Sequence, residues 1–179
     1  MPSGHIDPNI HRLYHELIHK REKQTASNTK CDKYKHMCVI IDRNGEILIS
    51  GYNIFKTNSS ETIHAEAMAL QRLYSKYGRP KRRFTVDILV IRTNGGNSKP
   101  CVNCLKQMEK YSHIINIKNI YYSHEDEITG IRKDKFSALL KSDDKHVSSY
   151  YRHKMRKQGK LLNVPTTDSS SSSGDSDSD

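Results

Sequence analysis

The chain has 179 residues, of which 34% are hydrophobic, and its mean hydropathy is −0.81. This length suits one domain with a tail, and no apolar run approaches the roughly 20 residues that a membrane-spanning helix needs. The formal charge is +10, and four aspartates without a base in 168–179 make the rest of the chain still more basic. We therefore expect a polyanionic partner, either nucleic acid or a phosphorylated substrate, and no membrane.

Residues 1–9 lack the basic and then apolar pattern of a signal peptide, so we expect a cytoplasmic, reducing location, with the nucleus as an alternative. The four cysteines are Cys31, Cys38, Cys101 and Cys104. In a reducing compartment a Cys-x-x-Cys pair serves metal or redox chemistry more often than a disulfide, and Cys101 and Cys104 form such a pair.

The first half of the chain predicts a hairpin between two helices. Apolar residues at helical spacing mark the first helix, and a run of strong helix formers marks the second. Asn44-Gly45 between two apolar runs is a strong hairpin signal. The predicted elements are a helix over 10–22, a loop over 23–35, strands over 36–42 and 47–52, a loop over 53–63 and a helix over 64–77.

The second half continues the alternation of helices and strands. Its predicted elements are a buried, parallel-type strand over 86–92, a Gly-rich loop over 93–99, a helix over 101–111, strands over 117–123 and 127–131, and a helix over 134–141. The whole order is α-β-β-α-β-α-β-β-α, which favours an α/β fold with helices on both faces of one mixed sheet of about five strands.

The composition divides the chain into three parts. Residues 1–141 form the predicted domain, and 142–165 form a basic extension that includes Lys145–Lys160, with Tyr150 and Tyr151 among its cations. Residues 166–179 are Ser/Asp-rich and carry too little apolar surface to fold, so we predict disorder there. The basic extension is either a solvated tail or a surface that grips phosphates and stacks bases.

Two short motifs carry the chemistry of this sequence. His64-Ala65-Glu66 and Pro100-Cys101-Val102-Asn103-Cys104 each open a predicted helix. One imidazole and two thiolates supply the three protein ligands of a catalytic zinc site, which keeps a fourth position open for water. Cys101 and Cys104 are three residues apart and therefore lie on one face of a helical turn, where the helix dipole favours the thiolate.

Glu66 follows the histidine by two residues, so its side chain points about 200° around the helix from that of His64. This placement is poor for metal ligation but suits a proton shuttle beside the open position. The alternatives are a structural zinc site with Cys31 or Cys38 as fourth ligand and a redox role for the Cys-x-x-Cys pair. Both leave Glu66 unexplained.

The pair HAE and PCVNC resembles the zinc signature of the cytidine and deoxycytidylate deaminase superfamily, which includes tRNA adenosine deaminases. The resemblance covers about residues 10–140 and implies a three-layer α/β/α sandwich. It implies that His64, Cys101 and Cys104 bind zinc and that Glu66 is the catalytic acid and base. It further implies that Asn53 contacts sugar or base and that the Ala65 N–H faces the base, although Asn53 also suits an ordinary turn.

The sequence departs from both main branches of the superfamily. Ala67-Met68 stands where deoxycytidylate deaminases have Asn-Ala, and Lys99 stands where the tRNA type has Glu. We expect zinc-dependent deamination of a cytosine-type nucleoside or nucleotide such as dCMP. The alternatives are a base within RNA or single-stranded DNA, or a non-catalytic nucleic-acid-binding protein with a relic zinc site. The resemblance also predicts a homo-oligomer.

Overall fold

The computed structural model describes residues 6–26, 36–55, 62–78, 83–93, 96–143 and 146–147. The contacts divide the chain into two units, Met1–Ser148 and Ser149–Asp179, and all the described residues belong to the first. The expected disordered tail over 166–179 and nearly all of the basic extension lie outside the described residues. No helix in the described part of the chain is long and apolar enough to cross a membrane.

Five strands form one mixed sheet in the order β2-β1-β5-β6-β7. Its strands are β1 (His36–Ile41), β2 (Ile47–Tyr52), β5 (Phe84–Arg92), β6 (Ile115–Ser123) and β7 (Ile131–Lys135). Strands β5 and β6 run parallel, and the other neighbouring pairs are antiparallel. The predicted hairpin is confirmed, and the Asp42 side chain accepts hydrogen bonds from the backbone N–H groups of Asn44 and Glu46 in its turn.

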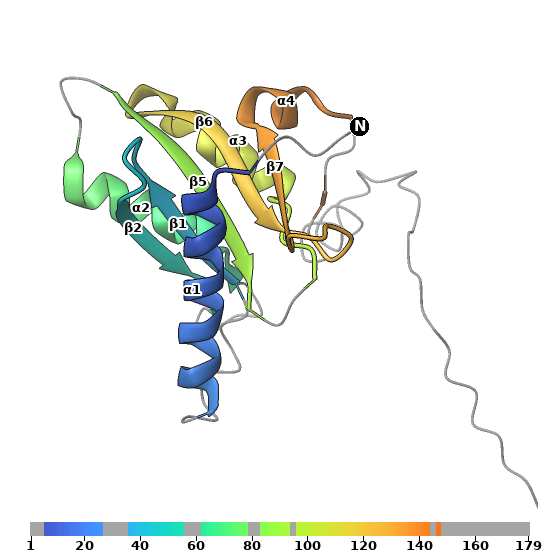
Figure 1. Cartoon of the computed structure of the whole chain (residues 1–179). Helices are drawn as coiled ribbons and strands as arrows, with labels where there is room; N and C mark the ends of the chain where they lie inside the picture. The colour runs from blue at the N-terminus through green and yellow to red at the C-terminus, as the bar shows by residue number, and fades with distance from the viewer. Residues whose placement is uncertain are drawn as a thin grey trace, which may run out of the picture. The chain divides into compact units, whose positions relative to one another are not determined.

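Helices cover both faces of this sheet, as Figure 1 shows. The helix α1 (Pro8–Ala26) packs on one face through Ile10 and Tyr14. The other face carries α2 (Ala65–Tyr77), α3 (Val102–Lys110) and α4 (Phe136–Lys141), and a short 3-10 turn, η2 (Tyr111–His113), follows α3. The three-layer α/β/α sandwich is therefore confirmed.

The central strands of the sheet are buried on both faces. In β1 and β5, residues that point to one face pack against α2 and α3, and their neighbours in sequence pack toward α1. Burial on both faces requires continuous apolar runs rather than alternation. The runs CVII in β1 and ILVI in β5 have this property, and all eight residues are buried.

The helix α2 lies directly on β2 at Gly51. A Cβ atom at this position would lie 2.5 Å from the Ala65 carbonyl oxygen and 2.5 Å from the Ala69 amide nitrogen. Such close approach of backbone to backbone is available only to glycine. The contact fixes the first turn of α2 and thereby the residue that precedes it, His64.

Several predicted elements were wrong in detail. The chain over 124–130 is a turn rather than a strand over 127–131. Gly130 adopts a φ of 69°, and the backbone N–H of His124 donates a hydrogen bond to the Gly130 carbonyl group across this turn. Strand β7 starts only at Ile131, so α4 begins at Phe136 rather than at residue 134. The helix α1 continues through Ala26, beyond the predicted end at residue 22.

The predicted loop over 53–63 contains a two-stranded ladder. It consists of β3 (Ile54–Phe55) and β4 (Thr62–Ile63), in which Ile54 pairs with Ile63. Pairs this short give almost no period-two pattern, so the sequence did not reveal them. The ladder leads the chain from the end of β2 into the start of α2.

Candidate metal centre and active site

The N-termini of α2 and α3 meet at the end of the sheet where β5 terminates. His64 is the N-cap residue of α2, and Cys101 is the N-cap residue of α3; both have extended backbone angles. Cys104 lies in the first turn of α3. The carbonyl groups of His64 and Cys101 accept the first intrahelical bonds, from Met68 and from Leu105. Both predicted helices therefore begin one residue later than the sequence indicated.

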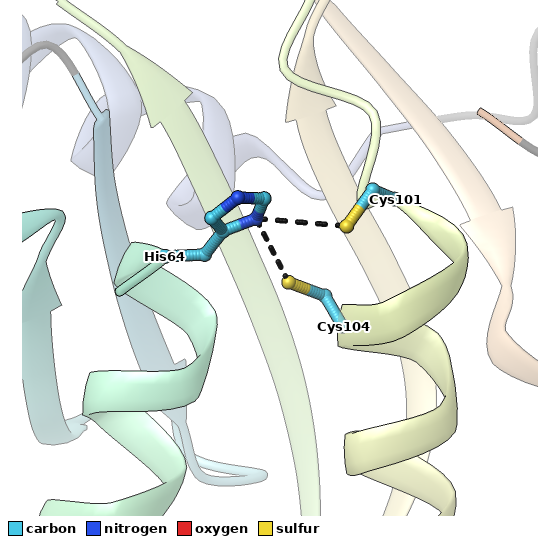
Figure 2. A group of neighbouring side chains, drawn as sticks. All are labelled: His64, Cys101 and Cys104. Atoms are coloured by element: carbon cyan, nitrogen blue, oxygen red, sulfur yellow. Dashed lines mark hydrogen bonds between the residues drawn. The ribbon is translucent and has the colours of Figure 1, made fainter. Parts of the chain in front are cut away.

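The three predicted ligands converge on one point, as Figure 2 shows. The His64 Nδ1 atom lies 3.5 Å from the Cys101 sulfur and 3.2 Å from the Cys104 sulfur. All three potential ligand atoms lie within 4.8 Å of one another. Both cysteines are buried, and His64 is partly exposed, so the cluster has a protein side and a solvent side.

The two thiols share one negative charge. A hydrogen bond with Cys104, strengthened by one with His64, lowers the pKa of Cys101 to about 4, although burial opposes this shift. The same hydrogen bond to Cys101 raises the pKa of Cys104, so that Cys104 keeps its proton. The pKa of His64 is raised, chiefly by its hydrogen bond with Cys101. Protons held in this way are those that a divalent cation displaces from a thiolate site.

The donor set fits zinc. Imidazole and thiolate are the ligands that structural and catalytic zinc sites use, and three of them match the catalytic type. Within the described residues, no fourth Cys, His, Asp or Glu joins this group. Cys38, considered as a fourth ligand, lies in β1 and packs in the core beside α2 as a small apolar side chain. Cys31 lies outside the described residues.

Glu66 lies inside the first turn of α2 and is only 5% exposed. It does not belong to the group of converging ligand atoms, but its carboxyl group has a hydrogen bond with Cys104. Burial raises the pKa of Glu66 above its usual value, against the lowering effect of nearby His64. The carboxyl group is therefore next to the cluster without being part of it.

Asn53 lies beside His36 at the start of β1, and Ala65 directly follows His64. The Asn53 side-chain oxygen accepts a hydrogen bond of 2.9 Å from the backbone N–H of His36, and the Asn53 N–H donates to the His36 carbonyl group. These bonds tie the end of β2 to the start of β1. Ala65 is fully buried, and as the first residue of α2 it has an N–H without an acceptor in the helix.

A buried serine pair holds the loop that leads to Cys101. The Ser98 hydroxyl group donates to the Val90 carbonyl group and accepts from both the N–H and the hydroxyl group of Ser123. The Ser123 hydroxyl oxygen accepts in turn from the Arg92 N–H. Every hydroxyl group of the pair is satisfied, so the loop is fixed to the ends of β5 and β6. Sequence reasoning missed both serines, because the sequence shows nothing of such pairing.

His36, Arg92 and His146 also gather near the cluster. Burial lowers the pKa of His36, and together with the smaller effects of the Arg92, His64 and His146 charges it brings this pKa to about 4. The His146 carbonyl group accepts a hydrogen bond of 2.8 Å from the Val102 N–H at the start of α3. The chain after α4 therefore returns to the metal centre. The one available sequence signal was the position of Arg92 at the end of a buried strand.

The family model described as "Cytidine and deoxycytidylate deaminase zinc-binding region" matches residues 10–123, a span that includes all three converging ligands. No curated protein sequence gave a significant match.

Similar solved structures include a cytidine deaminase from Burkholderia pseudomallei, with 19% identity, a TM-score of 0.48, and coverage of 73% of this chain and 97% of that one. They also include the dCMP deaminase from the cyanophage S-TIM5 in complex with dCMP and dUMP, with 20% identity, a TM-score of 0.44, and coverage of 80% and 98%.

Proposed function

We propose that this chain, which belongs to the cytidine and deoxycytidylate deaminase family, is a zinc-dependent hydrolytic deaminase of a cytosine-type nucleoside or nucleotide such as dCMP. The observation that carries the proposal is the convergence of His64, Cys101 and Cys104 beside a buried carboxyl group. Three ligands with an adjacent acid and base are the arrangement of a catalytic zinc site rather than a structural one.

His64, Cys101 and Cys104 would hold the zinc ion. Zinc in such a site supplies Lewis acidity, which makes water a usable nucleophile near neutral pH. The fold contributes two helix N-termini at this point, and their dipoles stabilise the thiolates. Because both sulfur atoms are buried, bulk water is kept from the protein side of the site.

Glu66 would move the protons of the reaction. It accepts a proton from the attacking water and donates it to the ring nitrogen next to the attacked carbon. It then transfers the remaining proton of that water, now on the added hydroxyl group, to the departing amine. Cytosine and water thereby give uracil and ammonia. A carboxyl group whose pKa is raised by burial is suited to both taking up and releasing a proton near neutral pH. Ala65 would present its free N–H to the base, and Asn53 would contact the sugar or base.

A second candidate function is deamination of a base within RNA or single-stranded DNA. The formal charge of +10 favours it, because basic surfaces attract polynucleotides. The same positive charge would also attract the phosphate group of a single nucleotide. The homo-oligomer and the cytoplasmic location expected from the sequence stay predictions.

Ammonia release from a panel of substrates tests the proposal. Zinc-loaded protein is given deoxycytidine, cytidine, dCMP, adenosine, guanine, and pools of RNA and single-stranded DNA. We expect a cytosine-type mononucleotide or nucleoside to be the best substrate. Release from the adenosine or guanine samples alone would contradict the proposed substrate class, and release from the RNA or DNA pool alone would establish the second candidate.

Substitution of Glu66 separates catalysis from folding. Glu66→Ala should retain one zinc ion per chain and lose at least about 10²- to 10⁴-fold in rate, because a positioned acid and base contributes that much. Glu109→Ala, which removes an exposed carboxyl group from α3, is the matched control and should keep full activity. Loss of zinc together with activity in Glu66→Ala would show that Glu66 is a ligand and would refute this mechanism.

A further inference from the structure

Two histidine side chains lie together on α1, away from the metal centre. His11 and His15 are four residues apart, a spacing that places both side chains on one face of a helix. Their Nε2 atoms are 3.2 Å apart, and the two rings meet edge to face with centroids 4.4 Å apart. His15 is exposed and His11 is partly exposed, so solvent reaches the pair. The helix α1 covers the face of the sheet opposite α2 and α3 (Figure 1).

The separation of the two Nε2 atoms fits a shared metal ion. A histidine nitrogen binds zinc at about 2.0–2.1 Å, so two such ligands of one ion lie about 2.9–3.4 Å apart at octahedral or tetrahedral angles. The observed 3.2 Å is within this range, so small rotations of the two rings suffice to bring both nitrogens to one ion. In the hydrogen bond between the rings, one nitrogen donates a proton to the lone pair of the other. A metal ion would displace this proton.

The residues around the pair restrict the His15 ring. This ring contacts the ring of Tyr14, with centroids 5.1 Å apart, and Tyr14 is buried against the sheet. The positive charge of Arg12, which follows His11 in the chain, is paired with Glu16 at 3.7 Å. A side chain that is already held in place loses less conformational entropy when it binds a ligand. The packing on α1 therefore favours metal binding by the pair.

We propose that His11 and His15 bind a late divalent transition metal ion, such as Zn²⁺, at a second site. Imidazole suits zinc, copper and nickel, whereas magnesium and calcium prefer oxygen ligands. Two histidines four residues apart on a helix also supply two of the zinc ligands in metalloproteases. Among the residues that the structure describes, no third His, Cys, Asp or Glu brings a ligand atom to the pair. The ion therefore keeps positions open to water, and it binds more weakly than at the three-ligand metal centre.

An ion at this site would connect two successive turns of α1. The same turns carry Ile10 and Tyr14, which pack against the sheet. Because the ion binds the folded helix and the unfolded chain no longer holds the two nitrogens together, binding stabilises the folded protein. The urea midpoint of the zinc-loaded protein should therefore rise further with added Zn²⁺, and it should rise less in a variant without the pair.

Calorimetric titration tests the inference with the untagged full chain, loaded beforehand with zinc at the metal centre. Added Zn²⁺ should bind the wild-type protein at about one further ion per chain, and Mg²⁺ should not bind at this site. His11→Gln and His15→Gln should each weaken this binding at least about tenfold, since loss of a mere supporting contact already costs about 10- to 100-fold. His113→Gln, which changes an exposed histidine in η2, is the matched control and should bind as the wild type does.

Two further measurements separate this site from the metal centre and from effects on folding. Cys104→Ser should lose the tightly bound zinc of the metal centre and still bind Zn²⁺ through His11 and His15. In nuclear magnetic resonance spectra of the zinc-loaded wild-type protein, the ring nitrogen signals of His11 and His15 should shift together as further Zn²⁺ is added. This experiment needs no variant and so does not depend on how a variant folds.

Three results would overturn the inference. One is the absence of further Zn²⁺ binding by the zinc-loaded wild-type protein. Another is further binding that neither His11→Gln nor His15→Gln weakens, which would place the ion elsewhere. The third is a pair of ring signals that stay in place during the titration. In each case the proposed deaminase function stands, because it depends on the metal centre alone.

Discussion

Replacement of Gly51 by alanine should damage both the fold and the metal centre. The added Cβ atom would lie 2.5 Å from backbone atoms of Ala65 and Ala69, whereas ordinary van der Waals contact begins at 3.4 Å. Backbone atoms cannot turn aside as a flexible side chain can, so the first turn of α2 must withdraw from β2. We expect Gly51→Ala to lose about 3 kcal/mol in free energy of unfolding, at the upper end of the usual cost of overpacking.

The same displacement should weaken zinc binding. His64 immediately precedes Ala65, and a shift of its backbone approaching 1 Å exceeds the roughly 0.2 Å tolerance of a zinc–ligand distance. We expect zinc affinity to fall by about 10- to 100-fold, comparable to the effect of losing a supporting contact around a metal site. Because the two losses have one cause, they should appear together.

Two measurements check this reasoning. Urea denaturation of the zinc-free protein gives the change in stability, and competition with a chelator gives zinc affinity. Ser50→Ala, at the neighbouring position on the opposite face of β2, is the control and should change stability by less than about 0.5 kcal/mol. A Gly51→Ala protein with wild-type stability and zinc affinity would show that α2 does not rest on β2 as the structure describes.

Three further predictions concern the metal, the loop before it, and alkaline pH. Cys104→Ser should lose most of its bound zinc in metal analysis, because a two-ligand site holds zinc far less well. The control Cys38→Ser should lose stability but retain zinc. Full zinc retention in Cys104→Ser would show that this residue is not a ligand. Ser98→Ala should lower the free energy of unfolding by about 2 kcal/mol in urea denaturation, because it leaves the buried partners of its hydroxyl group unpaired. Ser112→Ala, which changes an exposed serine, should leave this free energy unchanged. Equal stability of the two variants would contradict the hydrogen bonds described for Ser98. Burial raises the pKa of Tyr121 to about 12, so this tyrosine loses its proton at lower pH in the unfolded chain than in the folded one. The free energy of unfolding should therefore fall as pH rises from about 10 to 12. Tyr121→Phe should show a smaller fall in the urea midpoint over this range, and an equal fall in both proteins would refute the raised pKa of Tyr121.

The sequence by itself determined the order of the main elements and the chemistry of the site. Continuous apolar runs such as 86–92 can be buried on both faces only in a central strand, so the sandwich followed from local pattern. His64 and the pair Cys101 and Cys104 could be picked out as candidate zinc ligands because zinc accepts few residue types, and because three-residue spacing places two thiols on one helical turn.

Local pattern failed where longer-range contacts decide the structure. The chain over 127–131 has strand-like composition, yet Gly130 adopts a φ of 69° and turns the chain, and the Tyr14 hydroxyl group of α1 lies 3.1 Å from where a Cβ atom there would stand. Likewise the hydrogen bond between the Asn53 side chain and the His36 backbone could not be foreseen from the sequence, and the contact of Asn53 with substrate stays a prediction. Neither contact leaves a trace in the surrounding residues.

Only the tertiary structure decided which residues surround the metal centre. Arg92, Ser98 and Ser123 come from separate segments, and each is unremarkable in its own stretch of sequence. They meet because β5 and β6 are parallel neighbours whose ends lie together, beside the starts of α2 and α3. Which residues can bind a metal depends on residue type and short spacing, and a sequence displays both directly. The burial, pairing and orientation of an arginine depend on strand order, which short-range pattern does not encode.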